Sequence, residues 1–134
     1  MTFFFDEQLP PAIVTALGET EQAAKHVVHE GLRGKSDEEV IQYAGARGWF
    51  FVTSNTDILR KPQERAAIIQ HGVGAFFFTG RANRDRFDWL QLIVNRWKDM
   101  QAFAESTPKP FTAQVPDRGA IKLISNRRIR RPRS

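Results

Sequence analysis

The chain has 134 residues, of which 41% are hydrophobic, enough to bury the core of a single domain. It contains no cysteine, which excludes a disulfide framework and a cysteine-based zinc site. No apolar run is long enough to span a bilayer, and the N-terminus lacks the pattern of a signal peptide, so we expect a cytoplasmic protein with no membrane partner.

The net charge of +5 comes from the C-terminal end of the chain. The arginines concerned are Arg127, Arg128, Arg130, Arg131 and Arg133, and without them the chain has 15 basic and 15 acidic residues. We therefore expect a neutral domain over residues 1–118, followed over 119–134 by a short edge strand and a basic tail that is disordered on its own. Such a tail fits a salt-sensitive contact with a phosphate backbone, and equally a contact with an acidic partner.

Strands and helices are predicted to alternate along the first half of the chain. Thr2–Phe5 is an unbroken apolar run, typical of a strand covered on both faces, and Asp6 and Glu7 end it. The elements that follow are a helix over Pro11–Leu17, a strand over Lys25–Val28, a helix from the capping box Ser36-Asp37-Glu38-Glu39 to Gly48, and a strand over Trp49–Val52.

The second half continues this alternation. A helix is expected from Pro62 to Gly72, and a strand over Ala75–Phe78. The longest helix is expected from Arg84 to about Phe103, with an apolar stripe of Phe87, Leu90, Val94 and Trp97 facing the sheet. Phe111–Val115 and Ala120–Ile124 are expected to be short edge strands.

This order predicts an α/β fold with a mostly parallel sheet of about four to five strands. Right-handed crossovers place the carboxyl ends of parallel strands at one edge, where ligands of open α/β sheets gather. That edge should carry Asp6 and Glu7, His29, the segment Asn55–Asp57, and Thr79.

Three aspartates are candidates for chemistry at this edge. Asp6 and Asp57 follow predicted strands, and Asp37 opens a predicted helix. A cluster of carboxylates needs a neutralising partner, and Mg²⁺ binds through one or two carboxylates plus substrate phosphates. Such an ion polarises a phosphoryl oxygen and lowers the pKa of an attacking water.

Each aspartate also has a purely structural interpretation. Asp6 could cap the turn after its strand, Asp37 and Glu38 could favour the helix dipole, and Asp57 could be a turn residue. The histidines His26, His29 and His71 match no zinc spacing, so surface or hydrogen-bonded core roles are expected for them.

Several stretches together carry a family resemblance over residues 2 to about 80. They are Phe4-Phe5-Asp6-Glu7-Gln8-Leu9-Pro10, Val27-Val28-His29, Ser36-Asp37-Glu38-Glu39, Gly48-Trp49-Phe50-Phe51-Val52-Thr53, Ile58-Leu59-Arg60-Lys61-Pro62-Gln63-Glu64-Arg65 and Gly72-Val73-Gly74-Ala75-Phe76-Phe77. In order and spacing these stretches resemble the PIN-like domain of VapC-type toxins.

The resemblance implies a three-layer α/β/α fold and a metal-dependent endoribonuclease that uses Mg²⁺ or Mn²⁺. It also implies RNA as substrate and an antitoxin protein as partner, and a homodimer is kept as a further candidate assembly. Asp6 matches the family's strand-one acid, and Asp37, or else Glu38, matches the acid of helix two. Asn55 stands where the family usually has an aspartate, so Asp57 is expected to compensate while Asn55 offers a carbonyl oxygen.

The leading hypothesis is therefore an RNA-cleaving enzyme with catalytic and metal-binding residues Asp6, Asp37 and Asp57, assisted by Asn55. Basic residues near the same edge would hold the RNA backbone; they are Arg60, Lys61, Arg65, Arg81 and Arg84. The alternative is a weakened or inactive PIN-like module that binds RNA or protein. A phosphoacceptor receiver domain ranks lower, because Asn55 stands where that class needs a phosphorylatable aspartate.

Overall fold

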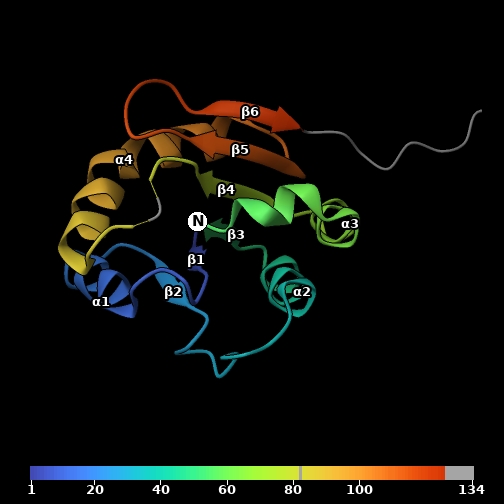
Figure 1. The fold of residues 1–134 in the computed structure, drawn as a ribbon, viewed down its shortest axis with the longest axis horizontal. Coiled ribbons are helices and arrows are strands. Elements are labelled where there is room, and N and C mark those ends of the chain that lie inside the picture. The colour runs from blue at the N-terminus through green and yellow to red at the C-terminus, as the bar shows by residue number, and fades with distance from the viewer. Residues whose placement is uncertain (82, 126–134) are drawn as a thin grey trace, which may run out of the picture.

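The computed structural model describes residues 1–81 and 83–125, so the expectations for the arginine-rich tail lie outside the described residues. The elements in chain order are β1 (Phe3–Phe5), α1 (Pro11–Glu19), β2 (Ala24–His26), α2 (Asp37–Arg47), β3 (Phe50–Thr53), the 3-10 helix η1 (Thr56–Arg60), α3 (Pro62–Gln70), β4 (Gly74–Phe78), α4 (Arg86–Ser106), β5 (Phe111–Val115) and β6 (Lys122–Ser125). Figure 1 shows this arrangement.

Six strands form one sheet in the order β2-β1-β3-β4-β5-β6. The first five run parallel, and β6 pairs antiparallel with β5. Phe5 at the end of β1 lies beside His26 of β2 and Val52 of β3. The carboxyl ends of these three strands therefore meet at one edge, as the sequence predicts.

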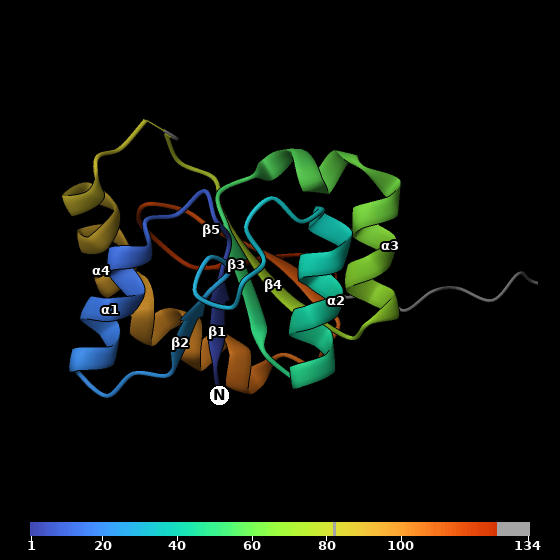
Figure 2. The same ribbon diagram turned by 90° about the horizontal axis from the view of Figure 1, so that it is seen from below.

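Two layers of helices cover the sheet, with α1 and α4 on one face and α2 and α3 on the other (Figure 2). The run of phenylalanines in β1 explains this arrangement, because successive side chains of a strand point to opposite faces. Phe3 and Phe5 pack in the core under α1 and α4, whereas Phe4 packs in the core under α2 and α3. The predicted three-layer α/β/α architecture is confirmed.

Some details of the sheet differ from the sequence-based expectation. The sheet has six strands, and β5 lies inside it between β4 and β6 instead of at an edge. The second strand is Ala24–His26, because the chain turns at Val27. The turn η1 after β3 was not predicted.

The apolar stripe predicted for the longest helix is wrong for two of its four members, whereas Trp97 is buried and Leu90 packs against the core. Phe87 is 63% exposed and Val94 is 51% exposed, and Leu90 is half-buried. The buried side of α4 instead contains Trp89, Leu92, Ile93, Arg96, Trp97, Met100 and Ala104. Apolar residues occur around most of this helix, so a 3-4-3 spacing can be drawn on more than one face.

Within the described part of the chain, none of the helices combines the length and apolar character needed to cross a membrane.

Candidate active site

Asp6 is a buried carboxylate at the carboxyl end of β1, with 4% of its surface exposed. Its Oδ1 accepts a hydrogen bond from the Glu7 backbone N–H at 2.8 Å, and its Oδ2 accepts one from the Thr53 hydroxyl at 2.8 Å. Burial raises the pKa of Asp6 above its ordinary value, the two hydrogen bonds oppose this rise, and the charges of Asp37 and Glu7 add to it.

Thr53 joins this carboxylate to the segment that follows β3. Its buried hydroxyl donates to Asp6 and accepts from the backbone N–H of Asn55 at 2.9 Å. The Asn55 side-chain Oδ1 in turn accepts from the Asp57 N–H at 3.2 Å, which makes Asn55 the N-cap of η1. The carbonyl oxygen predicted for a metal is therefore engaged in capping a turn.

Asp37 is the first residue of α2 and is half-buried. The helix begins here because the Ser36 hydroxyl accepts a hydrogen bond from the Glu39 N–H, as the predicted capping box requires. Burial raises the pKa of Asp37; Lys61 opposes this rise, and Glu64 and Glu7 add to it. The charged residues at the start of α3 therefore lie near enough to the start of α2 to influence the pKa of Asp37.

The structure brings two of the three predicted aspartates into electrostatic contact. The charge of Asp37 acts on Asp6, and Glu7 acts on both of them. Asp57 is not among the groups that shift the pKa of Asp6 or Asp37, and it is an exposed residue of η1. Over residues 1–81 and 83–125, no group of three or more Asp, Glu or His side chains is arranged to hold a metal ion.

A family model described as a PIN like domain matches residues 1–80, which is more than half of the chain. The chain belongs to the PIN-like domain family. Comparison with curated proteins and with solved structures gave no match. Membership in this family indicates a nuclease-type fold, and the matched segment contains β1, α2 and β3, the elements that carry the acids.

The carboxylates of Asp6 and Asp37 are of the ligand type that a hard divalent cation prefers. Each Asp6 oxygen accepts a single protein hydrogen bond, and a carboxylate oxygen can accept two, so a lone pair remains on each. Mg²⁺ commonly keeps several waters and binds through one or two carboxylates plus substrate phosphates. Asp6 and Asp37 could hold such an ion, and a cation would offset both the burial that raises the pKa of Asp6 and the smaller contribution of the Asp37 charge.

The predicted RNA-contacting residues fall into two groups. Arg60, Lys61 and Arg65 are exposed on η1 and the start of α3, which follow the carboxyl end of β3. Arg81 forms an ion pair with Asp88 at 3.7 Å. The side chain of Arg84 is 8% exposed and donates to both oxygens of Asp117 at 2.6 and 2.7 Å, so its guanidinium is already paired.

Sequence reasoning placed Glu7 at this edge but did not name Glu7, Thr53 or Glu64 as site residues. Glu7 adjoins Asp6 in the sequence, and Thr53 is the last residue of β3, so both had a positional signal. Glu64 lies in the first turn of α3, and its effect on Asp37 depends on how α3 packs beside α2. That packing is a tertiary feature that spacing along the chain does not reveal.

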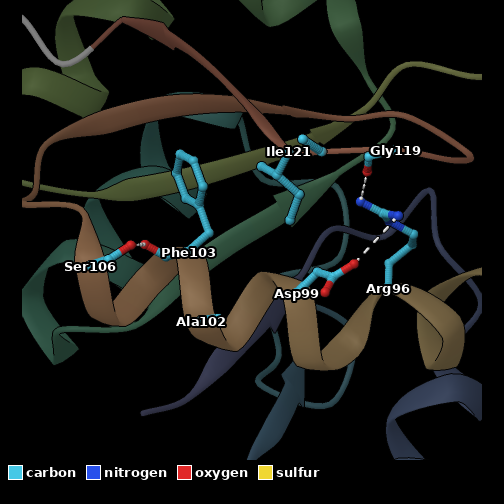
Figure 3. Close-up of a pocket in the computed structure, with 8 residues that line it drawn as sticks. Arg96, Asp99, Ala102, Phe103, Ser106, Gly119 and Ile121 are labelled. Carbon is cyan, nitrogen blue, oxygen red and sulfur yellow. Dashed lines mark hydrogen bonds and ion pairs between the residues drawn. The ribbon is translucent and has the colours of Figure 1, made fainter.

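A separate hollow of about 440 Å³ lies between α4 and the connection from β5 to β6 (Figure 3). Its lining includes Arg96, Asp99, Phe103 and Ile121, and none of the predicted site residues. Arg96 donates to the backbone carbonyl of Gly119 and pairs with Asp99 at 3.5 Å. The hydrogen bond to Gly119 attaches the β5–β6 connection to α4, whereas the pair with Asp99 lies within the helix.

Proposed function

We propose that this PIN-like domain is a metal-dependent endoribonuclease, with Asp6 and Asp37 as the residues that hold Mg²⁺ or Mn²⁺. The observation that supports this proposal most directly is the pair of carboxylates from β1 and α2, which lie close enough for the charge of Asp37 to raise the pKa of Asp6. Buried carboxylates with raised pKa values, placed at a strand end of an α/β sheet, are typical of functional sites.

The roles of the protein groups follow from their contacts. Thr53 and the Glu7 N–H fix both oxygens of Asp6, so the carboxylate keeps one orientation without a ligand. The exposed side chains of Arg60, Lys61 and Arg65 would bind RNA phosphates beside the acids. The bound cation would supply Lewis-acid polarisation of the scissile phosphate and an activated water.

The test is cleavage of RNA in Mn²⁺ by the native chain and by single variants. Asp6→Ala and Asp37→Ala should each reduce the rate by roughly 100-fold or more, because a bound metal ion contributes several kcal/mol to such a transition state. Asp57→Asn is the matched control, since this exposed aspartate acts on neither carboxylate, and its rate should stay within a few-fold of native. Equal activity of native protein and Asp6→Ala would refute the assignment.

A second candidate function is an RNA-binding or protein-binding module that does not cleave. It is favoured by the capping role of Asn55, which leaves the site without the acid usual at that position. The variant Asn55→Asp separates the two functions, because aspartate caps a helix equally well and adds the missing charge. If cleavage occurs only in Asn55→Asp, the natural chain is a binding module.

We extend the proposal to a toxin of a toxin–antitoxin pair, which is supported by the resemblance of the first 80 residues to VapC-type toxins. Induced expression of the native chain should arrest growth of a bacterial host, and expression of Asp6→Ala to the same level should not. Growth arrest by both proteins would show that toxicity does not depend on the acid pair, and would contradict this extension.

A further inference from the structure

The imidazole of His26 is fully buried at the end of β2 and uses both ring nitrogens. Nε2 lies 2.7 Å from the backbone carbonyl oxygen of Leu9, and Nδ1 lies 3.0 Å from the backbone N–H of Val28. A backbone N–H can only donate, so Nδ1 accepts and Nε2 carries the proton that is donated to Leu9. These contacts require the neutral ring in one tautomer.

The two partners of this ring belong to the two segments that deliver the acids. Leu9 closes the turn that starts at Asp6, since its N–H donates to the Asp6 carbonyl at 3.0 Å. Val28 lies in the connection that leads from β2 to the first residue of α2, Asp37. The same segments touch once more, where the Gly34 N–H donates to Glu7 Oε2 at 3.4 Å.

We propose that His26 is a positioning residue for the acid pair. Its neutral ring holds the turn after Asp6 against the connection that leads to Asp37, and thereby fixes the position of one acid-bearing segment relative to the other. The role in ligand binding rests on the proposed function, whereas the link between the two segments does not. Both hydrogen bonds of His26 act through the backbone, so no contact between His26 and substrate is implied.

The link should be sensitive to acid. Burial lowers the pKa of His26 below its ordinary value of 6.5; the hydrogen bond to Leu9 and the charge of Glu7 oppose this, and His29 and Arg33 add to it. Protonation would place an N–H at Nδ1 opposite the N–H of Val28, which breaks that hydrogen bond. Because the folded-state pKa is depressed, the link is intact above pH 6.5 and is lost as the pH falls through the lowered pKa.

Two substitutions and one control separate positioning from general stability. His26→Leu removes both hydrogen bonds while keeping a buried side chain. His26→Gln keeps an amide N–H donor for Leu9 and an oxygen acceptor, and does not titrate. Met100→Ala is the control, because Met100 is fully buried on α4, on the face of the sheet opposite α2 and α3.

The first measurement is amide hydrogen exchange at pH 7.5, under conditions where the global stabilities of the variants are matched by temperature. In His26→Leu, exchange of the Val28 and Gly34 amides should be roughly 10-fold faster than in Met100→Ala, as expected for loss of an ordinary hydrogen bond. In the native chain the protection factors of the same amides should fall as the pH is lowered through the depressed pKa of His26, and His26→Gln should lack this acid dependence. Equal exchange rates in His26→Leu and Met100→Ala would show that His26 does not hold the two segments together.

The second measurement is Mn²⁺ binding by titration calorimetry at pH 7.5. His26→Leu should bind roughly 10- to 100-fold more weakly than Met100→Ala, the range seen when an outer partner of a metal ligand is lost, and His26→Gln should recover part of the affinity. Equal affinities in His26→Leu and Met100→Ala would refute the positioning role even if the link exists. If the native chain binds no Mn²⁺, the proposed function fails, and the exchange measurement still decides whether His26 holds the two segments together.

Discussion

Asp6 illustrates how a proposed metal ligand can oppose folding in the free protein. Its pKa is raised by burial, which means that the folded state binds the carboxyl proton more tightly than the unfolded chain does. The favourable contribution is therefore present below the unfolded pKa of 3.8 and is lost as the pH rises through the folded pKa. At neutral pH the ionised side chain is destabilising, and a bound cation would remove this effect.

Replacing Asp6 with Asn should therefore stabilise the metal-free protein at pH 7 while abolishing cleavage. Asn has the same shape, and the Thr53 hydroxyl can rotate to accept from its amide, so the local hydrogen bonds can be kept. The measurement is the melting temperature in EDTA, where the advantage of Asp6→Asn should shrink as the pH approaches 4. Asp57→Asn should leave stability within about 0.5 kcal/mol of native, as exposed substitutions usually do. A lower melting temperature for Asp6→Asn at pH 7 would contradict this account.

Thr53→Val tests the hydroxyl that connects Asp6 with Asn55. The change keeps the branched shape but removes the donor to Asp6 and the acceptor for the Asn55 N–H. We expect a loss of about 1–3 kcal/mol in urea unfolding, the penalty for leaving such groups unpaired. The pKa of Asp6, followed by carboxyl carbon NMR, should rise further because a hydrogen bond to its charged form is lost. Thr15→Val on the exposed side of α1 provides the control, and equal effects of both changes would exclude a special role for Thr53.

At the scale of single elements, the sequence predicted what local chemistry determines. The unbroken apolar runs in β1, β3 and β4 are fully buried, and the Ser36 capping box starts α2 as expected. The proposed pairing of Asp6 with Asp37 follows from the parallel topology, which places the end of β1 and the start of α2 at the same edge. The position of Asp57 depends on how Asn55 caps η1, which spacing along the chain does not reveal.

The longest helix shows where a periodic pattern becomes ambiguous. The buried side of α4 includes Arg96, which is only 6% exposed. A charged residue at this position makes a prediction from the sequence favour another side of the helix as the buried one. Arg96 donates to the backbone carbonyl of Gly119, a contact that depends on tertiary structure, and it also pairs with Asp99, three residues further along the same helix. The choice between two apolar faces was therefore decided by contacts that periodicity does not contain.

Neighbouring residues on α4 give a direct test of this orientation. Ile93 is fully buried, whereas Val94, the next residue, is 51% exposed. Ile93→Ala should destabilise the protein by about 2–5 kcal/mol, as for other large-to-small changes in a core. Val94→Ala should change stability by less than about 0.5 kcal/mol, and urea unfolding of both variants measures the difference. A larger loss in Val94→Ala would restore the stripe predicted from the sequence.

At the scale of the whole molecule, the parallel strands place their carboxyl ends, and the polar residues that follow them, at one edge of the sheet. Both faces of the sheet are covered by helices, so polar groups at the strand ends are the ones that can reach a ligand. Over the described residues, Arg60, Lys61 and Arg65 are the exposed basic side chains on η1 and the start of α3, whereas Arg81 and Arg84 pair with acids. For the proposed RNA substrate, the arginine-rich C-terminal end of the sequence is a candidate for a further basic contact.

Removing residues 127–134 should strongly reduce the salt dependence of RNA binding. The same truncation should have little effect on the free energy of unfolding. The segment contains five arginines, and each contact with a single-stranded phosphate changes the slope of log K against log salt by about 0.7, so the slope should become less steep by up to about 3.5. The measurement is fluorescence anisotropy with single-stranded RNA over a series of KCl concentrations, in an Asp6→Ala background that prevents cleavage. A chain of native length with the five arginines changed to glutamine should behave like the truncated one, because charge and not length carries the effect. If both slopes equal that of the Asp6→Ala parent, the arginines do not contact RNA, and an acidic protein partner becomes the better explanation for them.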